Sequence, residues 1–134
     1  MSYSSLIEVQ NAKIYFHKTH EIVQIVKDKC DLIITMNVTY SLAKALCDPQ
    51  KTVLYFVSCS KDPKSLCKAR YFIATSHMKI YRTDEKVFFS SANLSLSSWL
   101  EITVETQRTK EIDEFVNGIV RELRLRDDYI VAFH

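Results

Sequence analysis

Three short, almost continuously apolar runs limit what this chain can fold into. The run "DLIITMN" (31–37) is typical of a strand covered on both faces, "TVLYFVS" (52–58) has the same character, and "YFIAT" (71–75) also reads as strand. Between them, "HEIVQIVKDKC" (20–30) and "YSLAKALCD" (40–48) have apolar residues at helical spacing, and Pro49 ends the second helix. Alternating strands and helices predict an α/β sandwich.

The remaining segments extend this pattern. "AKIYF" (12–16) and "EITVETQ" (101–107) are expected strands, 75–101 is an expected hairpin, and 61–70 is either a third helix or a basic loop. In "KEIDEFVNGIVRELRL", apolar residues recur at i, i+3, i+4, i+7, i+8 and i+11, which predicts a surface helix. We expect one domain over residues 1–134, with a mixed, mostly parallel sheet flanked by helices on both faces.

Charge and composition narrow the class of protein. The net charge of +2 is too small for binding of a polyanion by bulk electrostatics, so any such site must be a local patch. No apolar run approaches the ~20 residues of a membrane span, and the start of the chain lacks the pattern of a secretory signal. We therefore expect a cytoplasmic protein that does not bind membranes. Four cysteines lack zinc-finger spacing and are expected as buried thiols, with disulfides left open: Cys30, Cys47, Cys59 and Cys67.

The expected hairpin holds an unusual density of groups able to handle a phosphate. In a strand, His77 and Lys79 share a face and lie roughly 6.5 Å apart, which suits one phosphoryl group. Asp84 has the opposite parity and would lie about 20 Å from His77, so it is expected at the turn.

The pairing of the two hairpin strands decides which groups meet. With a three-residue turn at 84–86, Lys79 faces Ser91 and His77 faces Asn93, which gathers all four on one face. A two-residue turn would shift the register by one and send Ser91 and Asn93 to the opposite face. We expect the first arrangement.

These residues resemble the HKD motif of the phospholipase D superfamily, usually written HxKxxxxDxxxxxxGSxN. The matching positions are His77, Lys79, Asp84, Ser91 and Asn93. Ser90 stands where the family has Gly, and the spacing from Asp84 to the Ser-x-Asn is one residue short. The order of strands and helices, with its closing amphipathic helix, is also similar to one half of the family fold.

The resemblance implies a two-step phosphodiester reaction without a metal or other cofactor. One His attacks phosphorus and a second His protonates the leaving oxygen, so two motifs are needed. This chain has one, because His17, His20 and His134 lie outside any His-x-Lys context. The resemblance therefore implies a homodimer that shares two copies of His77. A carboxylate should orient the imidazole, with Glu101 as the first candidate and Glu105 as the second.

Three functions remain open at this point: a nuclease acting on DNA or RNA, a phospholipid hydrolase of the same chemistry, and a catalytically silent nucleic-acid-binding dimer. The short single-motif chain is most similar to the family's dimeric nucleases, while Ser90 favours the silent module. Trp99 is expected in core packing, with base stacking as the alternative. The candidates for contact with nucleic acid, as opposed to a solvated helix face, are Lys61, Lys64, Lys68 and Arg70.

Overall fold

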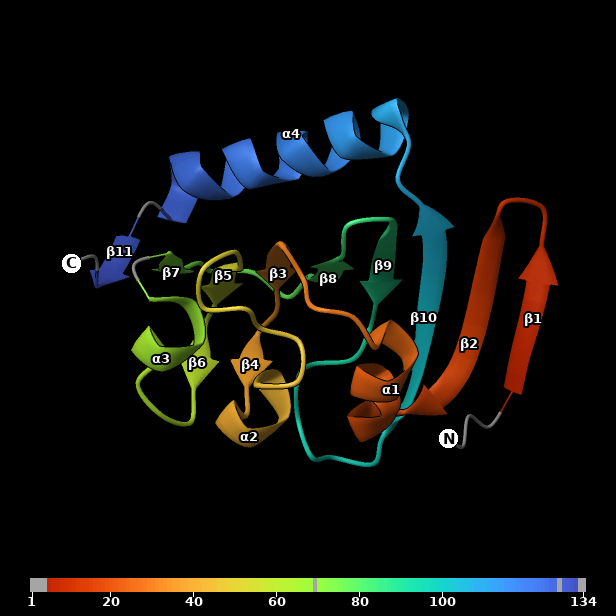
Figure 1. Ribbon diagram of the computed structural model, residues 1–134, viewed down its shortest axis with the longest axis horizontal. Coiled ribbons are helices and arrows are strands. Elements are labelled where there is room, and N and C mark those ends of the chain that lie inside the picture. The colour runs from red at the N-terminus through yellow and green to blue at the C-terminus, as the bar shows by residue number, and fades with distance from the viewer. Residues whose placement is uncertain (1–4, 69, 128, 133–134) are drawn as a thin grey trace.

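The structure is a computed structural model that describes residues 5–68, 70–127 and 129–132, so that His134 lies outside the described residues. Its centre is one sheet (Figure 1). The strands follow one another across this sheet in the order β1 (Ser5–Val9), β2 (Ala12–Lys18), β10 (Leu100–Gln107), β9 (Lys86–Ser90), β8 (Lys79–Arg82), β3 (Leu32–Ile34), β5 (Val53–Phe56), β7 (Tyr71–Ile73) and β11 (Tyr129–Ala132). A second, two-stranded sheet pairs β4 (Asn37–Val38) with β6 (Ser58–Cys59).

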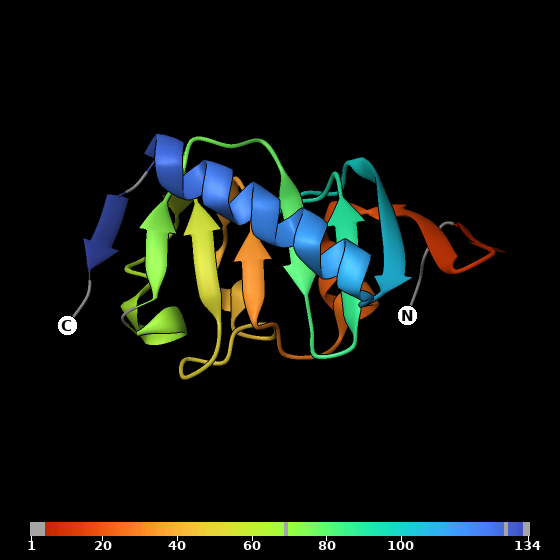
Figure 2. The ribbon, with the colours of Figure 1, turned by 90° about the horizontal axis from the view of Figure 1, so that it is seen from above.

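Helices cover both faces of the large sheet, as expected. On one face lie α1 (Ile22–Val26), which follows a 3₁₀ turn at Thr19–Glu21, and the short helices α2 (Tyr40–Ala43) and α3 (Lys64–Cys67). On the other face lies α4 (Lys110–Asp127), which crosses the sheet obliquely (Figure 2). The apolar stripe of α4 turns inward at Val116 and Leu123, where it meets Ile34 and Ile80 of the sheet. The sheet therefore separates two apolar cores.

The expectation of a mostly parallel sheet is wrong, although the sheet is mixed. Only β3–β5 and β5–β7 are parallel among the described pairs of the large sheet, and the other six pairs are antiparallel. Parallel neighbours need a long crossover, whereas antiparallel neighbours are joined by a tight turn. Among the described residues, the two crossovers that join parallel neighbours run through α2 and α3. The sequence analysis also missed β1 and β11, the two outermost strands.

One end of the sheet carries the residues of interest, and we call it the motif edge. There β3, β5 and β7 end, β8 begins, β9 ends at Ser90, and β10 begins at Leu100 beside the end of β2. Figure 2 shows the β7–β8 and β9–β10 connections along this same edge. The hairpin turn between β8 and β9 lies at the opposite end.

Candidate active site at the motif edge

The β8–β9 register differs by one residue from the expected one. Thr83 N donates to Lys86 O at 2.9 Å around a two-residue turn, and Lys79 pairs with Ser90, not with Ser91. The prediction that Lys79 faces Ser91 and that His77 faces Asn93 is therefore wrong.

Burial explains the observed register. It pairs Tyr81 with Phe88 in the core under α1–α3, and Ile80 with Phe89 on the α4 face. The expected register would have opposed Ile80 to Ser90 and turned a hydroxyl toward the apolar α4 core. Because a one-residue slip exchanges the two faces of a strand, burial of apolar side chains on both faces specifies the pairing strongly.

His77 and Lys79 lie where β8 begins. Lys79 is the first residue of the strand and is half-buried, on the same face as Tyr81. His77 is exposed, in the segment that leads into β8. The imidazole is thus open to a ligand, and the backbone of Lys79 is held by the start of a paired strand.

Asn93 reaches this region by a route that the sequence analysis did not foresee. Its Oδ1 accepts three hydrogen bonds, from Thr35 Oγ1 at 3.1 Å, Met36 N at 3.0 Å and Asn37 N at 3.1 Å. Residues 35–37 leave the sheet at the end of β3, which pairs directly with β8. Because three donors hold the oxygen, the orientation of the amide is fixed and its Nδ2 hydrogens remain to donate elsewhere.

Ser91 and Glu101 hold each other. Ser91 Oγ donates to Glu101 Oε1 at 2.7 Å and accepts from Ile102 N at 3.0 Å, while Thr19 Oγ1 donates to Glu101 Oε2 at 2.6 Å. Both carboxylate oxygens thus receive hydroxyl donors, and within the described residues no hydrogen bond joins Glu101 to His77.

Glu105, the second candidate, has a structural role. It is buried, accepts from Tyr15 Oη at 2.7 Å and pairs with Lys86 Nζ at 3.2 Å. Its cross-strand neighbour is Phe88, which lies inside the sheet and away from the motif edge. Glu105 therefore cannot orient the imidazole of the same chain.

A buried histidine behind the hairpin was missed. His17 is fully buried, with Nδ1 2.7 Å from Lys18 O and Nε2 2.7 Å from Thr103 Oγ1. Thr103 Oγ1 lies 2.7 Å from Ser90 Oγ, which accepts from Ala92 N at 2.9 Å. The Lys18 carbonyl can only accept a hydrogen bond, so His17 Nδ1 donates to it. In that tautomer Nε2 accepts a hydrogen bond from Thr103 Oγ1, which in turn accepts one from Ser90 Oγ.

This hydrogen-bonded chain gives Ser90, the residue in place of the family Gly, a role. Its hydroxyl joins β9 to β10 and fixes the bend at Ala92 that directs Asn93 toward β3. The alternation of "AKIYFHK" places His17 on the face of Tyr15, which would have suggested burial. Its partner depends on the pairing of Thr103 with Tyr15 and Ser90, which only the fold shows.

Asp84 lies at the turn, as predicted. It is exposed and pairs with Lys51, whose ammonium group donates a hydrogen bond and holds the pKa of the Asp84 carboxyl below its ordinary value. The same contact raises the pKa of Lys51. The turn is at the end of the sheet opposite His77, so Asp84 has a local structural role.

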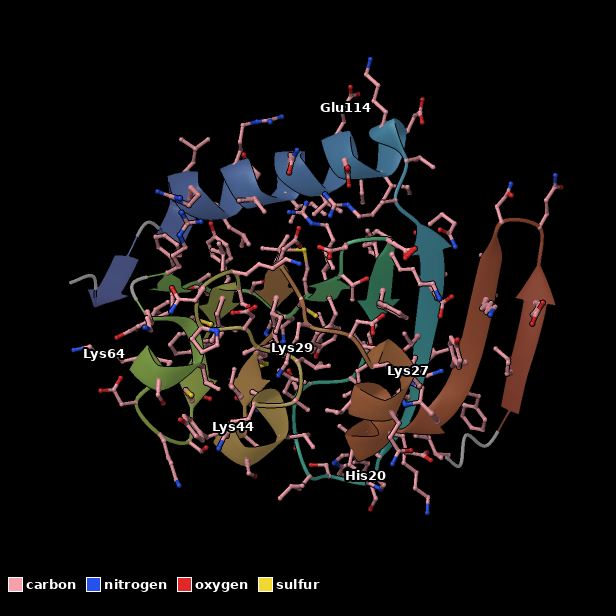
Figure 3. All side chains as sticks on the ribbon, in the orientation of Figure 1. His20, Lys27, Lys29, Lys44, Lys64 and Glu114 are labelled. Atoms are coloured by element: carbon pink, nitrogen blue, oxygen red, sulfur yellow. The ribbon has the colours of Figure 1, made fainter. Side chains whose placement is uncertain are left out.

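The candidate nucleic-acid contacts are all on the surface. Lys61, Lys64, Lys68 and Arg70 are exposed, and Lys61 Nζ lies 5.4 Å from the centre of the Tyr40 ring. Figure 3 shows Lys64 with Lys27, Lys29 and Lys44 on the side of the sheet that carries α1–α3. The expectation that Trp99 packs in the core is wrong, because its side chain is 75 % exposed.

The cysteines follow the expectation of buried thiols in three of four cases. Cys30, Cys47 and Cys67 are buried, Cys59 is half-buried, and all four are free. Burial raises the pKa of the Cys30 thiol well above its ordinary value.

The described part of the chain offers neither a metal-binding cluster nor a helix that could span a membrane. Within residues 5–68, 70–127 and 129–132, no three or more His, Cys, Asp or Glu side chains are grouped so that they could hold a metal ion. No helix among these residues combines the length and apolar character needed to cross a membrane. Comparison with models of known protein families, with curated proteins and with solved structures finds no match.

If the motif acts as the family resemblance implies, Asp84→Ala should reduce phosphodiester cleavage far less than His77→Ala or Lys79→Ala, because Asp84 is at the far end of the hairpin. Loss of its exposed, solvent-screened ion pair with Lys51 should change the folding free energy little. The comparison is one of initial cleavage rates for the three variants, each checked for folding by circular dichroism. Equal losses in folded proteins would show that Asp84 acts in the site.

Thr103→Val should destabilise the fold by about 1–3 kcal/mol, since it leaves buried His17 Nε2 and Ser90 Oγ without their shared partner. Thr106→Val is the matched control on β10, because Thr106 Oγ1 makes only a long contact, 3.5 Å, with Val87 O. Urea unfolding measures both. Equal stabilities of the two variants would mean that the hydrogen-bonded chain contributes nothing.

Proposed function

We propose that this protein is a phosphodiesterase of the phospholipase D type, most simply a nuclease, and that its fold corresponds to one half of that family's fold. The observation that carries the proposal is the meeting of the motif residues at one edge of the sheet. Lys79 begins β8 opposite Ser90, and Asn93 is anchored by three hydrogen bonds at the end of the adjacent strand β3. A nucleophile, a cation and an amide donor therefore come from neighbouring strands.

Each group has a part in phosphodiester cleavage. His77 attacks phosphorus through a neutral ring nitrogen, and a P–N bond forms as the P–O bond to the leaving group breaks. A second imidazole gives its proton to the leaving oxygen, then takes a proton from the water that hydrolyses the phosphohistidine. Lys79 and the Nδ2 hydrogens of Asn93 stabilise the negative charge on the equatorial oxygens. The mechanism therefore needs one ring neutral and the other protonated when the reaction starts.

The second imidazole is supplied by a second subunit. His17 is fully buried and bonded at both nitrogens, so it has no access to a substrate. In a two-fold dimer the same surface of each chain meets the other, which brings two copies of an exposed residue such as His77 to one place. The homodimer therefore completes a site of which each chain holds half.

The exposed lysines support nucleic acid as the substrate. Lys44 and Lys64 lie on the side of the molecule that carries α2 and α3 (Figure 3), and Lys61 lies over the Tyr40 ring of α2. Exposed lysines of this kind can contact the phosphates of a strand. Contacts of this kind carry no sequence preference.

One observation favours a second candidate, a catalytically silent nucleic-acid-binding dimer. Glu101 is engaged by Ser91 and Thr19 and makes no hydrogen bond to His77 within the described residues. Without a carboxylate partner, the imidazolium form of His77 would be less stabilised in the transition state.

Cleavage should survive removal of divalent metal ions, because the motif provides both its nucleophile and its cation. The assay uses single- and double-stranded DNA, RNA and a phospholipid, all in EDTA. His77→Ala purified in parallel controls for contaminating enzymes. Activity that disappears in EDTA and returns with magnesium would contradict this mechanism. Binding of nucleic acid with no cleavage would instead support the silent module.

Mixed dimers test the shared site. A dimer of one normal and one His77→Ala subunit lacks either the nucleophile or its acid–base partner, so it should be nearly inactive. After full subunit exchange, activity should follow the square of the normal fraction, and an equal mixture should keep about one quarter of full activity. Exchange is verified with mass-tagged subunits. A linear dependence, with about one half retained, would place a complete site within one chain.

A further inference from the structure

The segment before β10 presents a cluster of exposed apolar side chains at the motif edge. Leu96, Trp99 and Leu100 are 66 %, 75 % and 65 % exposed. The backbone beneath them is held firmly, since Thr19 N donates to Trp99 O at 3.0 Å and His20 N donates to Ser97 O at 3.1 Å. The indole of Trp99 therefore projects from an anchored backbone. Exposed clusters of large apolar residues at a rigid edge mark interaction surfaces.

An apolar groove lies at the same edge, between the 75–78 segment and α4. Its volume is about 520 Å³, and its apolar walls come from Met78, Phe115, Ile119 and Leu123. Gly118, the chain's only glycine, also lines it. Glycine is disfavoured inside a helix, yet a Cβ at this position would meet only Arg121 Nη2, at 3.7 Å. The missing side chain thus keeps the groove open. A volume of this size accommodates an indole with room to spare.

We propose that the groove receives Trp99 of a second copy of this chain, and that its own Trp99 enters the groove of that copy. Such a reciprocal contact is what a two-fold interface requires. The charges agree with it at one position, because Glu114 lines the groove and Lys18 is the cross-strand neighbour of Leu100. Glu122, which also lines the groove, is already paired with Arg126 at 3.2 Å. Figure 3 shows Glu114 on α4, on one side of the sheet, and His20 on the other side. His20 belongs to the 3₁₀ turn whose backbone holds the segment of Trp99. Tryptophan is also among the residue types most enriched at interface hot spots.

The position of the groove connects this contact to the site. Trp99 precedes β10, and the groove reaches from Met78, next to the start of β8, to Phe115 of α4, whose ring lies 6.2 Å from that of Phe89 in β9. His77 adjoins Met78 in the chain, so a two-fold contact that fills the groove places His77 of each subunit at the interface. This last step rests on the proposed function, whereas the contact itself does not.

Sedimentation and tryptophan fluorescence test the contact without any activity assay. Trp99 is the only tryptophan, so the emission of the protein reports its environment alone. On concentration, the wild type should form dimers and the emission maximum should shift to shorter wavelength, both with the same midpoint. Trp99→Ala, which removes the anchor, should raise the dimer dissociation constant at least about tenfold. Gly118→Leu, which fills the groove and favours the helix, should do the same.

Two matched variants serve as controls. Leu125→Ala removes an apolar side chain that is 80 % exposed and lies outside the groove, and Asn117→Leu adds the same bulk to α4 one residue away from Gly118. Both should dimerise as the wild type does, and circular dichroism verifies that all four variants fold.

The proposal would be overturned if the wild type dimerises and the Trp99→Ala and Gly118→Leu variants dimerise with the same dissociation constant. So would a protein that stays monomeric at every concentration and shifts its emission only on phospholipid vesicles. The fate of the proposed function is separate. If Gly118→Leu is monomeric and cleaves at the full rate per chain, the shared site is refuted and the contact is supported. If Gly118→Leu still dimerises and cleaves as the wild type does, only the contact is refuted.

Discussion

The hydrogen-bonded chain from His17 through Thr103 to Ser90 is the interaction on which the rest of the motif edge depends. It ties β2, β10 and β9 together in a buried layer, where an unpaired polar atom would cost about 1–3 kcal/mol. Ser90 then accepts from Ala92 N, and the bend that follows directs Asn93 to the end of β3. The amide that a phosphate would meet is therefore positioned from two sides, by β9 and by β3.

Apolar burial on both sheet faces, together with the local turn, decides the geometry of the hairpin. Ile80 and Val87 pack under α4 while Tyr81 and Phe88 pack under the short helices, and a slip of one residue would exchange these faces. Tyr81 Oη also donates to Ala92 O at 2.6 Å, which secures the segment beyond the strand. In this arrangement Lys79 lies opposite Ser90, so the position that departs from the family glycine is next to the motif's cation.

The sequence was sufficient for the strands with strong apolar patterns, for the helix α4 and for the turn at Asp84, because periodicity and turn chemistry are local properties. It was insufficient for the hairpin register, since the choice between two- and three-residue turns depends on which core receives Val87 and Phe88. The roles of His17 and Asn93 were also out of reach. Their partners, Thr103 and residues 35–37, are distant in the chain and are brought together only by sheet topology.

If the protein acts as we propose, His77 becomes covalently bonded to phosphorus during turnover. The reaction with a labelled oligonucleotide is quenched under denaturing conditions at neutral to alkaline pH, where a phosphohistidine persists, and the adduct is mapped by mass spectrometry. We expect one acid-labile phosphoramidate on the peptide that contains His77, absent from His77→Ala and still formed when Asp84 is replaced by Ala. Cleavage of the oligonucleotide at full rate by His77→Ala, or an adduct on another residue, would contradict it.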